Sequence, residues 1–568
     1  MTVVSSAKAF AFQYSLFRVQ ERLGFTMGLS EFDVVIIGGG HHGLTCAAYL
    51  ARAGVDVCVL EGRHEWGGAL ATSEVTRPGF CHNLHANFME FLHVMPFFQD
   101  FDLPSLGART VFPEIQAGIA FRDGRPPVLM YRNEQIEQTA KSFGVYSKHD
   151  ADAWRHLKNT ANQLEPVMAA GLYTPPSKWS PGEAVPSPFT AFASTFAMFG
   201  LDEELAFKSI RDCIDEQFES DEVRALLYRI AVEFAGPALE WPGSAYFFLF
   251  ACVFMPGCWR LMVGGTHRLN GAMVTACIKE GVTMREASRV RRILLDGERA
   301  VGVELRDGTR VHARRAVVSA IGLKDTFLDL VGEDHLSDYY QRRVKNFKDG
   351  PDQVLGSVAM ALHEAPHYKS ARHDPGIDRA WYQVVGYDSA KEVLDYCRAG
   401  HIDRIPELPA AGVWVNSLFD PCQAPAGKHS LSGWYFFPRA SALDEAGWEE
   451  IRRSYNARFL KLFGEFAPNM TRDNVIADYL LTPLDQERGM RMREGDFGHG
   501  AMTIDQLMGL RPFAGASHYS TEIEGLYLAG SCTHPGGGVT AACGYNCFKV
   551  MCEDLELPRV WESGKRFY

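Results

Sequence analysis

The sequence predicts an α/β protein in which two domains alternate along the chain. Three observations support this fold class: a glycine-rich turn after an apolar strand near residue 38, a second glycine-rich loop after a short strand near residue 530, and strand-like runs between them. A chain of 568 residues is long enough for several domains of roughly 100–200 residues each. A composition of 46% hydrophobic and 22% charged residues is typical of a globular protein.

The first glycine-rich turn joins two predicted strands through a helix. The run 32–37, Phe-Asp-Val-Val-Ile-Ile, is short and rich in β-branched residues, which is typical of a buried parallel strand. A helix is expected over 44–53 and a second buried strand over 55–60. Strand, glycine-rich turn, helix and strand in this order predict a Rossmann-like nucleotide-binding unit.

The glycines and the acid of this unit have separate roles in binding a dinucleotide. Gly38 makes the tight turn, Gly40 lets the backbone approach a pyrophosphate, and Gly43 lets the helix pack closely on the strand. The helix N-terminus offers free N–H groups to the phosphates, and we expect His42 to shape the phosphate loop. Glu61 ends the second strand, where a carboxylate accepts hydrogen bonds from ribose hydroxyls and disfavours a 2′-phosphate.

The residues after Glu61 indicate FAD in preference to NAD. A Gly-Gly pair follows shortly after this acid, in the segment Trp-Gly-Gly-Ala at 66–69. A pair at this position is typical of FAD proteins, in which the chain passes close to the flavin diphosphate and the ribityl arm. We therefore expect FAD contacts at Gly62, Arg63, Gly67, Gly68 and Ala69.

The middle of the chain contributes further strands to the predicted site. A helix is expected from 264 to 280, followed by strands over 282–286, 290–295, 300–305 and 311–320. In FAD oxidases an element of this kind carries a backbone contact to adenine. We place that contact at Val290.

The second glycine-rich loop lies near the C-terminus. A strand is expected over 525–528, and the loop 529–540 leads into a helix that continues through Met551. Its glycines allow close approach of the backbone, and the N-terminus of the helix can face the flavin N1–C2 carbonyl, where the helix dipole favours the anionic reduced flavin. We expect cofactor contacts at Gly530, Ser531, Gly537, Gly538 and Val539.

These motifs together resemble the phytoene desaturase and carotenoid oxidoreductase superfamily, and within it the phytoene-dehydrogenase-like proteins called pyridine nucleotide-disulfide oxidoreductase domain 2. The matching stretches are 34–43 with 54–69, 264–326, 495–512 and 525–546. The sequence departs from the superfamily pattern at 264–269, Gly-Gly-Thr-His-Arg-Leu, and at 542–544, Ala-Cys-Gly. No Cys-x4-Cys pair follows the first helix, so disulfide reductase chemistry is not expected.

The resemblance implies a fold of the FAD-dependent amine oxidase and phytoene desaturase type, with the cofactor domain interrupted along the chain. We expect an N-terminal extension at 1–30, an FAD-binding domain formed by 31–110, 262–345 and 485–568, and an α+β substrate domain formed by 111–261 and 346–484. In the substrate domain, strands are expected over 354–361, 412–418 and 431–437. Aromatic runs at 189–199 and 246–254 are candidates for the walls of an apolar pocket, although core packing is the alternative.

The resemblance also implies hydride transfer between flavin N5 and an apolar, unsaturated or isoprenoid-like substrate. Such a reaction can need a group that moves a proton. His534, His499 and His85 are the catalytic candidates, with a structural hydrogen bond as the alternative role of each. His82 and His85 would face opposite sides of a strand, so we expect no metal site there.

Three other functions fit the same motifs. A flavin-dependent double-bond isomerase would use reduced flavin without net redox change. An amine oxidase shares the fold and would contain an aromatic cage. A protein that binds prenyl groups or lipids without catalysis would need no flavin, whereas the complete glycine motifs and Glu61 favour a retained cofactor.

Composition narrows the partners and the compartment. A net charge of −12 and a pI near 5.9 argue against nucleic-acid binding. Thirteen scattered cysteines without a Cys-x-x-Cys pair predict a reducing, cytoplasmic compartment and no structural zinc. No apolar run reaches the roughly 18 residues that cross a bilayer. The sequence leaves open a peripheral membrane contact and an oligomeric state. It also leaves open whether residues 1–30 form a helix packed on the protein or a helix at a membrane interface.

Overall fold

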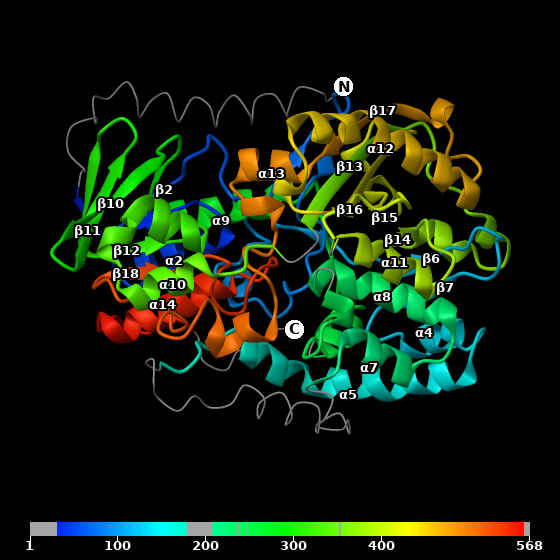
Figure 1. Cartoon of the computed structure of the whole chain (residues 1–568), viewed down its shortest axis with the longest axis horizontal. Helices are drawn as coiled ribbons and strands as arrows, with labels where there is room; N and C mark the ends of the chain where they lie inside the picture. The colour runs from blue at the N-terminus through cyan, green and yellow to red at the C-terminus, as the bar shows by residue number, and fades with distance from the viewer. Residues whose placement is uncertain are drawn as a thin grey trace.

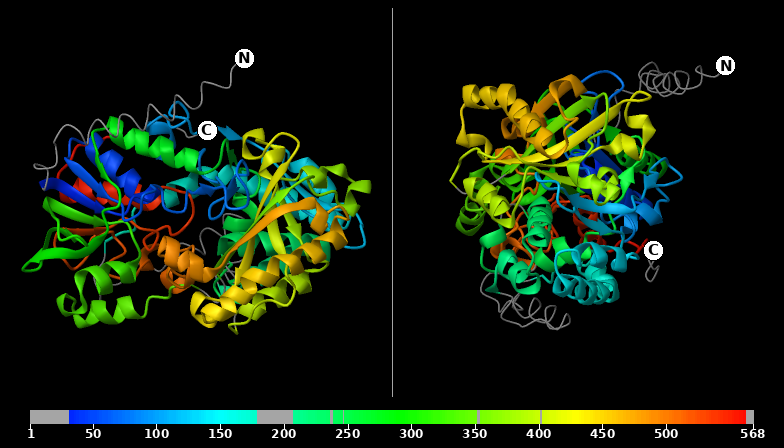
Figure 2. Two further views of the ribbon diagram at one scale, coloured as in Figure 1. Left: turned by 90° about the horizontal axis from the view of Figure 1, so that it is seen from above. Right: turned by 90° about the vertical axis from the view of Figure 1, so that its right-hand side faces the viewer.

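The computed structural model describes residues 31–178, 207–235, 238–245, 247–350, 354–400 and 402–561. Two seven-stranded sheets form the centres of two lobes (Figure 1), and a second view shows the lobes at opposite ends of the long axis (Figure 2). This arrangement confirms the α/β fold class. The expected N-terminal extension and the aromatic run 189–199 lie outside the described residues.

The first sheet contains the strands predicted around the two glycine-rich loops. Its order is β10–β11–β12–β1–β2–β9, and β18 pairs with β12 beyond the end of β11. The strands β18, β12, β1, β2 and β9 run parallel, whereas β10, β11 and β12 pair antiparallel. The strands are β1 (Glu31–Ile37), β2 (Val57–Leu60), β9 (Thr283–Arg285), β10 (Val290–Asp296), β11 (Arg299–Leu305), β12 (Arg310–Ser319) and β18 (Leu526–Leu528).

The carboxyl ends of the parallel strands meet at one edge of this sheet. Ile37 of β1 pairs with Leu60 of β2 and with Ser319 of β12, and Ser319 pairs with Leu528 of β18. The chain runs from β1 to β2 on one side, while β12 lies on the other side of β1, so the strand order reverses between β1 and β12. In open α/β sheets, ligands bind outside the carboxyl ends at such a reversal.

Helices cover the first sheet because its strands bury side chains on both faces. Val34 and Ile36 pack with α2 (His41–Arg52), α9 (His267–Lys279) and α14 (Ala542–Asp554) in one apolar cluster. Val35 and Ile37 point the other way, toward a cluster that includes α10 (Asp338–Lys345) and the π-helical turn Asp325–Val331. Alternate residues of a strand face opposite sides of its sheet, which accounts for the continuous apolar run of β1.

The second sheet is almost entirely antiparallel. Its order is β17–β13–β16–β15–β14–β6–β7, and only the β14–β6 pair is parallel. The strands are β6 (Ile115–Ile119), β7 (Val128–Tyr131), β13 (Val354–Leu362), β14 (Tyr382–Val385), β15 (Ala411–Trp414), β16 (His429–Phe437) and β17 (Val475–Leu481). Two short ladders, β3 (Thr72–Ser73) with β4 (His82–Asn83) and β5 (Thr110–Val111) with β8 (Leu261–Met262), lie outside both sheets.

Helices also cover both faces of the second sheet. The long helix α12 (Glu445–Phe466) packs on one face. On the other face lie α4 (Ile136–Phe143), α5 (Lys148–Leu172), α7 (Ile210–Gln217), α8 (Asp221–Ala235), α11 (Ala390–Gly400) and a π-helix, η3 (Phe248–Phe254) (Figure 1). Two shorter helices, α3 (Pro96–Asp100) and α13 (Pro483–Met490), complete the described α-helices.

Most of the predicted elements are confirmed, and the differences have local causes. The strand expected over 412–418 ends at Trp414, because the backbone turns at Val415 (ψ 73°) into the 3-10 turn Asn416–Leu418. The helix expected after the second glycine-rich loop begins at Ala542. Every strand of the first sheet lies in the segments assigned to the FAD-binding domain, and the domain bounds themselves stay a prediction.

The described residues also bear on membranes and metals. Within the described ranges, no helix is both long and apolar enough to cross a membrane. The same residues contain no group of His, Cys, Asp and Glu side chains that could hold a metal ion. His82 donates to the carbonyl of Leu431, whereas His85 lies beyond the end of β4 and lines a cavity.

Candidate active site

A cavity of about 740 Å³ extends from the carboxyl ends of the first sheet to the second sheet. Its volume lies in the range of roughly 300–1,000 Å³ that is common for small-molecule and cofactor sites. The predicted cofactor residues that line it are Gly38, Gly40, His42, Glu61, Gly62, Arg63, Gly68, Ala69, Val290, Ser531, Gly537, Gly538 and Val539. The cavity therefore brings both glycine-rich loops to one place.

The first glycine-rich turn forms a cradle that fits a diphosphate. Gly38 has a positive φ of 100°, and a Cβ on Gly43 would lie 2.2 Å from the Gly38 carbonyl oxygen, so both positions need glycine to close the turn. A Cβ on Gly40 would meet nothing within 4 Å and would enter the cavity. The N-terminus of α2 has no side-chain cap, which leaves N–H groups for an anion. These observations fit the diphosphate of FAD.

Glu61 is held in position by the backbone on either side of it. One carboxylate oxygen accepts a hydrogen bond from the N–H of Gly39 (2.8 Å), and the other accepts one from the N–H of Arg63 (2.8 Å). The carboxylate thereby joins the end of β2 to the turn after β1. Its position on the cavity wall is suited to the ribose hydroxyls of a dinucleotide.

Gly43, Gly67 and Gly530 do not line the cavity, and their contact with the cofactor stays a prediction. The N–H of Gly67 donates to the carbonyl of Gly39 (2.7 Å), and a Cβ there would collide with Asn270. A Cβ on Gly530 would lie 2.5 Å from the carbonyl oxygen of Ile321. In each case glycine allows two segments of this chain to approach closely.

Arg511 joins the two C-terminal loops that line the cavity. Its side chain is fully buried, and its guanidinium donates to carbonyl oxygens of both loops. The acceptors are Gly498, His499, Gly500, Ala501 and Gln506 on one side, and Ser531 and Thr533 on the other. Since each N–H has a carbonyl partner, the charge is stabilised by dipoles. Arg511 therefore fixes His499 relative to Ser531.

The catalytic candidates His534, His499 and His85 all line the cavity. Burial lowers the pKa of His534 and of His85 to about 4, and it also lowers the pKa of His499. All three side chains are therefore neutral near pH 7. The Nε2 of His534 donates to the carbonyl of Gly171 (3.0 Å), so its Nδ1 is an acceptor with no partner among the described residues. A catalytic role for these histidines stays a prediction.

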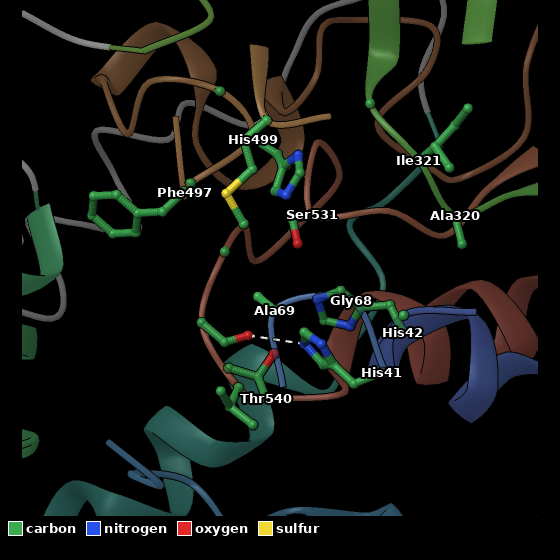
Figure 3. Close-up of a pocket in the computed structure, with 18 of the residues that line it drawn as sticks. His41, His42, Gly68, Ala69, Ala320, Ile321, Phe497, His499, Ser531 and Thr540 are labelled. Carbon is green, nitrogen blue, oxygen red and sulfur yellow. Dashed lines mark hydrogen bonds between the residues drawn. The ribbon is translucent and has the colours of Figure 1, made fainter. Parts of the chain in front are cut away.

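His41 links the first glycine-rich turn to the second. Its Nε2 donates to the carbonyl of Gly538 (3.1 Å), the contact drawn as a dashed line in Figure 3. Burial lowers its pKa to about 4, so the imidazole is neutral at physiological pH. Figure 3 shows His499 and Ser531 across the cavity from His41 and His42. Segments from the early and late parts of the chain thus face each other across the cavity that we expect to hold the cofactor.

Glu90 is a cavity residue that the sequence motifs did not identify. Its side chain is only 4% exposed, it lines the cavity, and a Cβ on Gly538 would lie 3.4 Å from its Oε1. Its Oε2 has no hydrogen-bond partner among the described residues. Burial raises the pKa of this carboxyl to about 8, although the backbone of Val539 opposes the shift. The signal in the sequence that could have identified Glu90 is a single acidic residue within an apolar run, Phe-Met-Glu-Phe-Leu at 88–92.

The remainder of the cavity is largely apolar. The apolar side chains that line it include Phe88, Phe91, Val167, Met168, Leu172, Phe247, Phe250, Met255, Leu355, Trp434, Phe497, Met502, Leu507 and Met508. Phe247 and Phe250 belong to the aromatic run 246–254, whose role as a wall is therefore supported. Eight of them come from α5, from η3 and its flanks, and from the second sheet, whereas Phe88, Phe91, Phe497, Met502, Leu507 and Met508 come from loops or short turns.

Comparisons with known proteins agree with this site. A family model described as FAD dependent oxidoreductase matches residues 33–194. One of the subunits of limonene dehydrogenase from Castellaniella defragrans is 29% identical over 94% of this chain and 96% of its own length. The protein is an FAD-dependent oxidoreductase. The alternative of a protein that binds prenyl groups or lipids without catalysis is therefore not supported.

Further relatives support the resemblance predicted from the motifs. The oxidoreductase is 28% identical to the mouse pyridine nucleotide-disulfide oxidoreductase domain-containing protein 2, over 93% of this chain and 94% of the relative. The 4,4′-diaponeurosporene oxygenase of Staphylococcus aureus is 21% identical over 89% of this chain and 95% of its own. Among solved structures, putrescine oxidase bound to putrescine has a TM-score of 0.59 at 16% identity, covering 93% and 99% of the two chains, which shows a shared fold.

The substitution Gly40→Val tests the cradle. The new side chain should meet no protein atom at its Cβ, so the fold should persist, while the space for the diphosphate is filled. We expect no bound FAD and thermal unfolding that matches that of the unaltered protein stripped of FAD, measured by flavin absorbance and by circular dichroism. Gly271→Val, which also has open space at its Cβ, is the matched control and should remain yellow. Full FAD content in Gly40→Val would show that the cradle is misplaced.

The substitution Arg511→Met tests the link between the two loops. It leaves several buried carbonyl oxygens without donors, each at a cost of about 1–3 kcal/mol. We expect a loss of at least about 3 kcal/mol in the free energy of unfolding and weaker FAD binding, measured by denaturant titration with and without added FAD. Arg511→Lys keeps the charge but has fewer hydrogen-bond donors, so its free energy of unfolding should lie between those of the unaltered protein and of Arg511→Met. An unchanged stability in Arg511→Met would contradict the proposed role.

Proposed function

We propose that the oxidoreductase removes hydride from an apolar, unsaturated or isoprenoid-like substrate and transfers it to flavin N5. The observation that carries this proposal is the continuity of the cavity, which joins the glycine cradle to an apolar region without a break. A substrate in the apolar region would lie beside the second glycine-rich loop, where the flavin ring is expected. Phe88, Phe250 and Trp434 would exclude water from its carbon chain.

The named relatives support an apolar substrate. The limonene dehydrogenase and the 4,4′-diaponeurosporene oxygenase are named for limonene and 4,4′-diaponeurosporene, which are hydrocarbons. A hydrocarbon has no N–H or O–H donor and no lone-pair acceptor, so binding must come from burial of its surface. Burial of apolar surface contributes about 25 cal/mol per Å², which an aromatic and aliphatic lining can supply.

Glu90 is suited to take up the proton that accompanies this oxidation. One C–H bond of the substrate gives up the hydride, a neighbouring C–H bond gives up a proton, and the electron pair of the second bond forms the new C=C bond. When bound, FAD supplies the two-electron acceptor. The Glu90 carboxylate packs against Gly538 in the loop expected beside the flavin, so it can accept the proton there.

A flavin-dependent double-bond isomerase is the second candidate. The observation that favours it is the raised pKa of Glu90, about 8, because a carboxylic acid that stays protonated at neutral pH can donate a proton to a double bond. Donation at one carbon and loss of a proton at another would move the double bond without net redox change. The two functions differ in whether substrate alone reduces the flavin.

Anaerobic mixing separates these functions. We expect isoprenoid hydrocarbons to bleach the flavin absorbance of the oxidised protein, because hydride leaves the substrate, and we expect primary amines to leave it unchanged. Stopped-flow absorbance measures the reaction, and Gly40→Val provides the flavin-free control. Product formation only after chemical reduction of the flavin, with no electrons consumed, would establish isomerisation in place of dehydrogenation. Bleaching by amines alone would identify an amine oxidase.

The pH dependence of flavin reduction tests Glu90. As a proton acceptor the carboxyl must be ionised, and its pKa is raised to about 8, so the rate should rise with pH and level off above about pH 8. Glu90→Gln should slow reduction by about 10²-fold or more and remove this pH limb while FAD stays bound. Glu90→Asp should restore part of the rate. A rate in Glu90→Gln that equals that of the unaltered protein at every pH would exclude the role.

A further inference from the structure

An ion pair lies buried at the apolar end of the cavity, on helix α8. Arg229 and Glu233 are one helical turn apart, their side chains are 0% exposed, and Arg229 Nη1 lies 2.8 Å from Glu233 Oε1. The hydroxyl of Tyr382, on β14, donates to the same carboxylate oxygen. Figure 1 shows α8 in the lobe of the second sheet, whereas α2 and α14, the helices that follow the two glycine-rich loops, belong to the other lobe.

The pair is incompletely hydrogen-bonded. Within the part of the chain that the structure describes, Glu233 Oε2 and Arg229 Nε have no hydrogen-bond partner, although Arg229 Nη2 donates to the carbonyl of Trp434 (3.2 Å). Removing two charges from water costs several kcal/mol per ion, and unpaired atoms increase that cost. A stable core would be built more easily from apolar side chains at these positions. The pair is thus better explained by a ligand than by stability.

Glu233 reaches the cavity that the substrate would occupy. It lines the cavity together with Phe247, Leu355 and Trp434, which are apolar apart from the indole N–H. Phe88 lines the same region, and its ring lies 5.7 Å from that of Trp434. A polar atom of the substrate at this end would be surrounded by apolar walls and would find its hydrogen-bond partner at Glu233.

The chemistry of the free atom defines the group that it can bind. A carboxylate oxygen only accepts hydrogen bonds, so the ligand group must donate one. Arg229 already neutralises the charge of Glu233, so an ammonium group would gain little net attraction while losing its hydration. A hydroxyl is a neutral donor, and it loses much less hydration free energy on burial than an ammonium group does. Burial raises the pKa of Glu233 to about 7 against the opposing effect of Arg229, so the acceptor form prevails above that pH.

We propose that Arg229 and Glu233 form a polar subsite that binds a hydroxyl group of an otherwise apolar substrate, at the end remote from the reacting carbon. This inference rests on the proposed function and deepens it: the substrate is an isoprenoid-like alcohol. The Glu233 carboxylate accepts the hydroxyl hydrogen bond and fixes how far the carbon chain extends toward the glycine loops. Glu233 acts as a specificity residue and takes no part in moving the hydride or the proton.

Matched ligands test the subsite. Geraniol, geranyl methyl ether and the hydrocarbon myrcene, together with farnesol and its methyl ether, are titrated at pH 8.5 into the oxidised FAD-bound protein. Binding is read anaerobically from the change in the flavin spectrum on mixing, before reduction. We expect each alcohol to bind at least about tenfold more tightly than its ether, because a site built to bond a hydroxyl rejects analogues that cannot donate. Equal binding of alcohol and ether would overturn the proposal.

Two variants distinguish recognition from structural support. Arg229→Met with Glu233→Leu replaces the pair by apolar side chains of similar size, and should abolish the preference for alcohols while keeping the FAD spectrum and a cooperative unfolding transition. Glu222→Gln, on the same helix but outside the cavity lining, is the control and should keep the preference. A double variant that unfolds at lower temperature and still prefers alcohols would assign the pair a structural role only.

The results also separate this inference from the proposed function. If ethers and myrcene bleach the flavin as fast as the alcohols do, hydride removal from apolar substrates stands and the subsite fails. If no probe of either length binds or reduces the flavin, both the substrate class and the subsite are wrong. If alcohols bind selectively but only a pre-reduced protein converts them, the subsite stands and the reaction is isomerisation.

Discussion

The guanidinium of Arg511 is the contact on which the cavity depends most directly. It is buried, and no carboxylate of the described residues forms an ion pair with it; the carbonyl oxygens of two loops supply the stabilisation that a counter-ion would otherwise give. Each loop is rich in glycine and has little secondary structure of its own, so neither could hold its shape alone. Because the same side chain bonds both, the position of one loop determines the position of the other. The positions of His499 and of the backbone at Ser531 therefore depend on the hydrogen bonds of the Arg511 guanidinium.

The sheet supplies the other half of the geometry. Parallel pairing places the ends of β1, β2, β12 and β18 at one edge, although β18 lies nearly the whole chain length after β1. Glu61 and His41 then join segments across that edge, the first to the turn after β1 and the second to Gly538. The nucleotide-binding part is therefore held together by contacts within the chain.

The sequence predicted the local parts of this arrangement well, because glycine spacing and apolar runs report backbone geometry directly. It could not show what each glycine is needed for: an added Cβ would collide with Asn270 at Gly67 and with Ile321 at Gly530, and a glycine required by the chain looks the same in sequence as one required by a ligand. Glu90, Arg511 and the pair on α8 could not be identified, since their meaning depends on burial by distant segments. A lone acid within an apolar run, such as Glu90, is nevertheless a signal to weigh in related sequences.

The pairing of β12 with two different strands has a consequence for synthesis on the ribosome. The first half of its outer edge is paired with β11, which precedes it, but the second half waits for β18, which is made more than 200 residues later. Until then, unpaired N–H and C=O groups next to very apolar side chains remain available to other chains. A nascent or truncated polypeptide that lacks β18 can therefore associate wrongly with other chains at Val317–Ser319. Once β18 is made, its pairing with these residues protects that edge of the sheet.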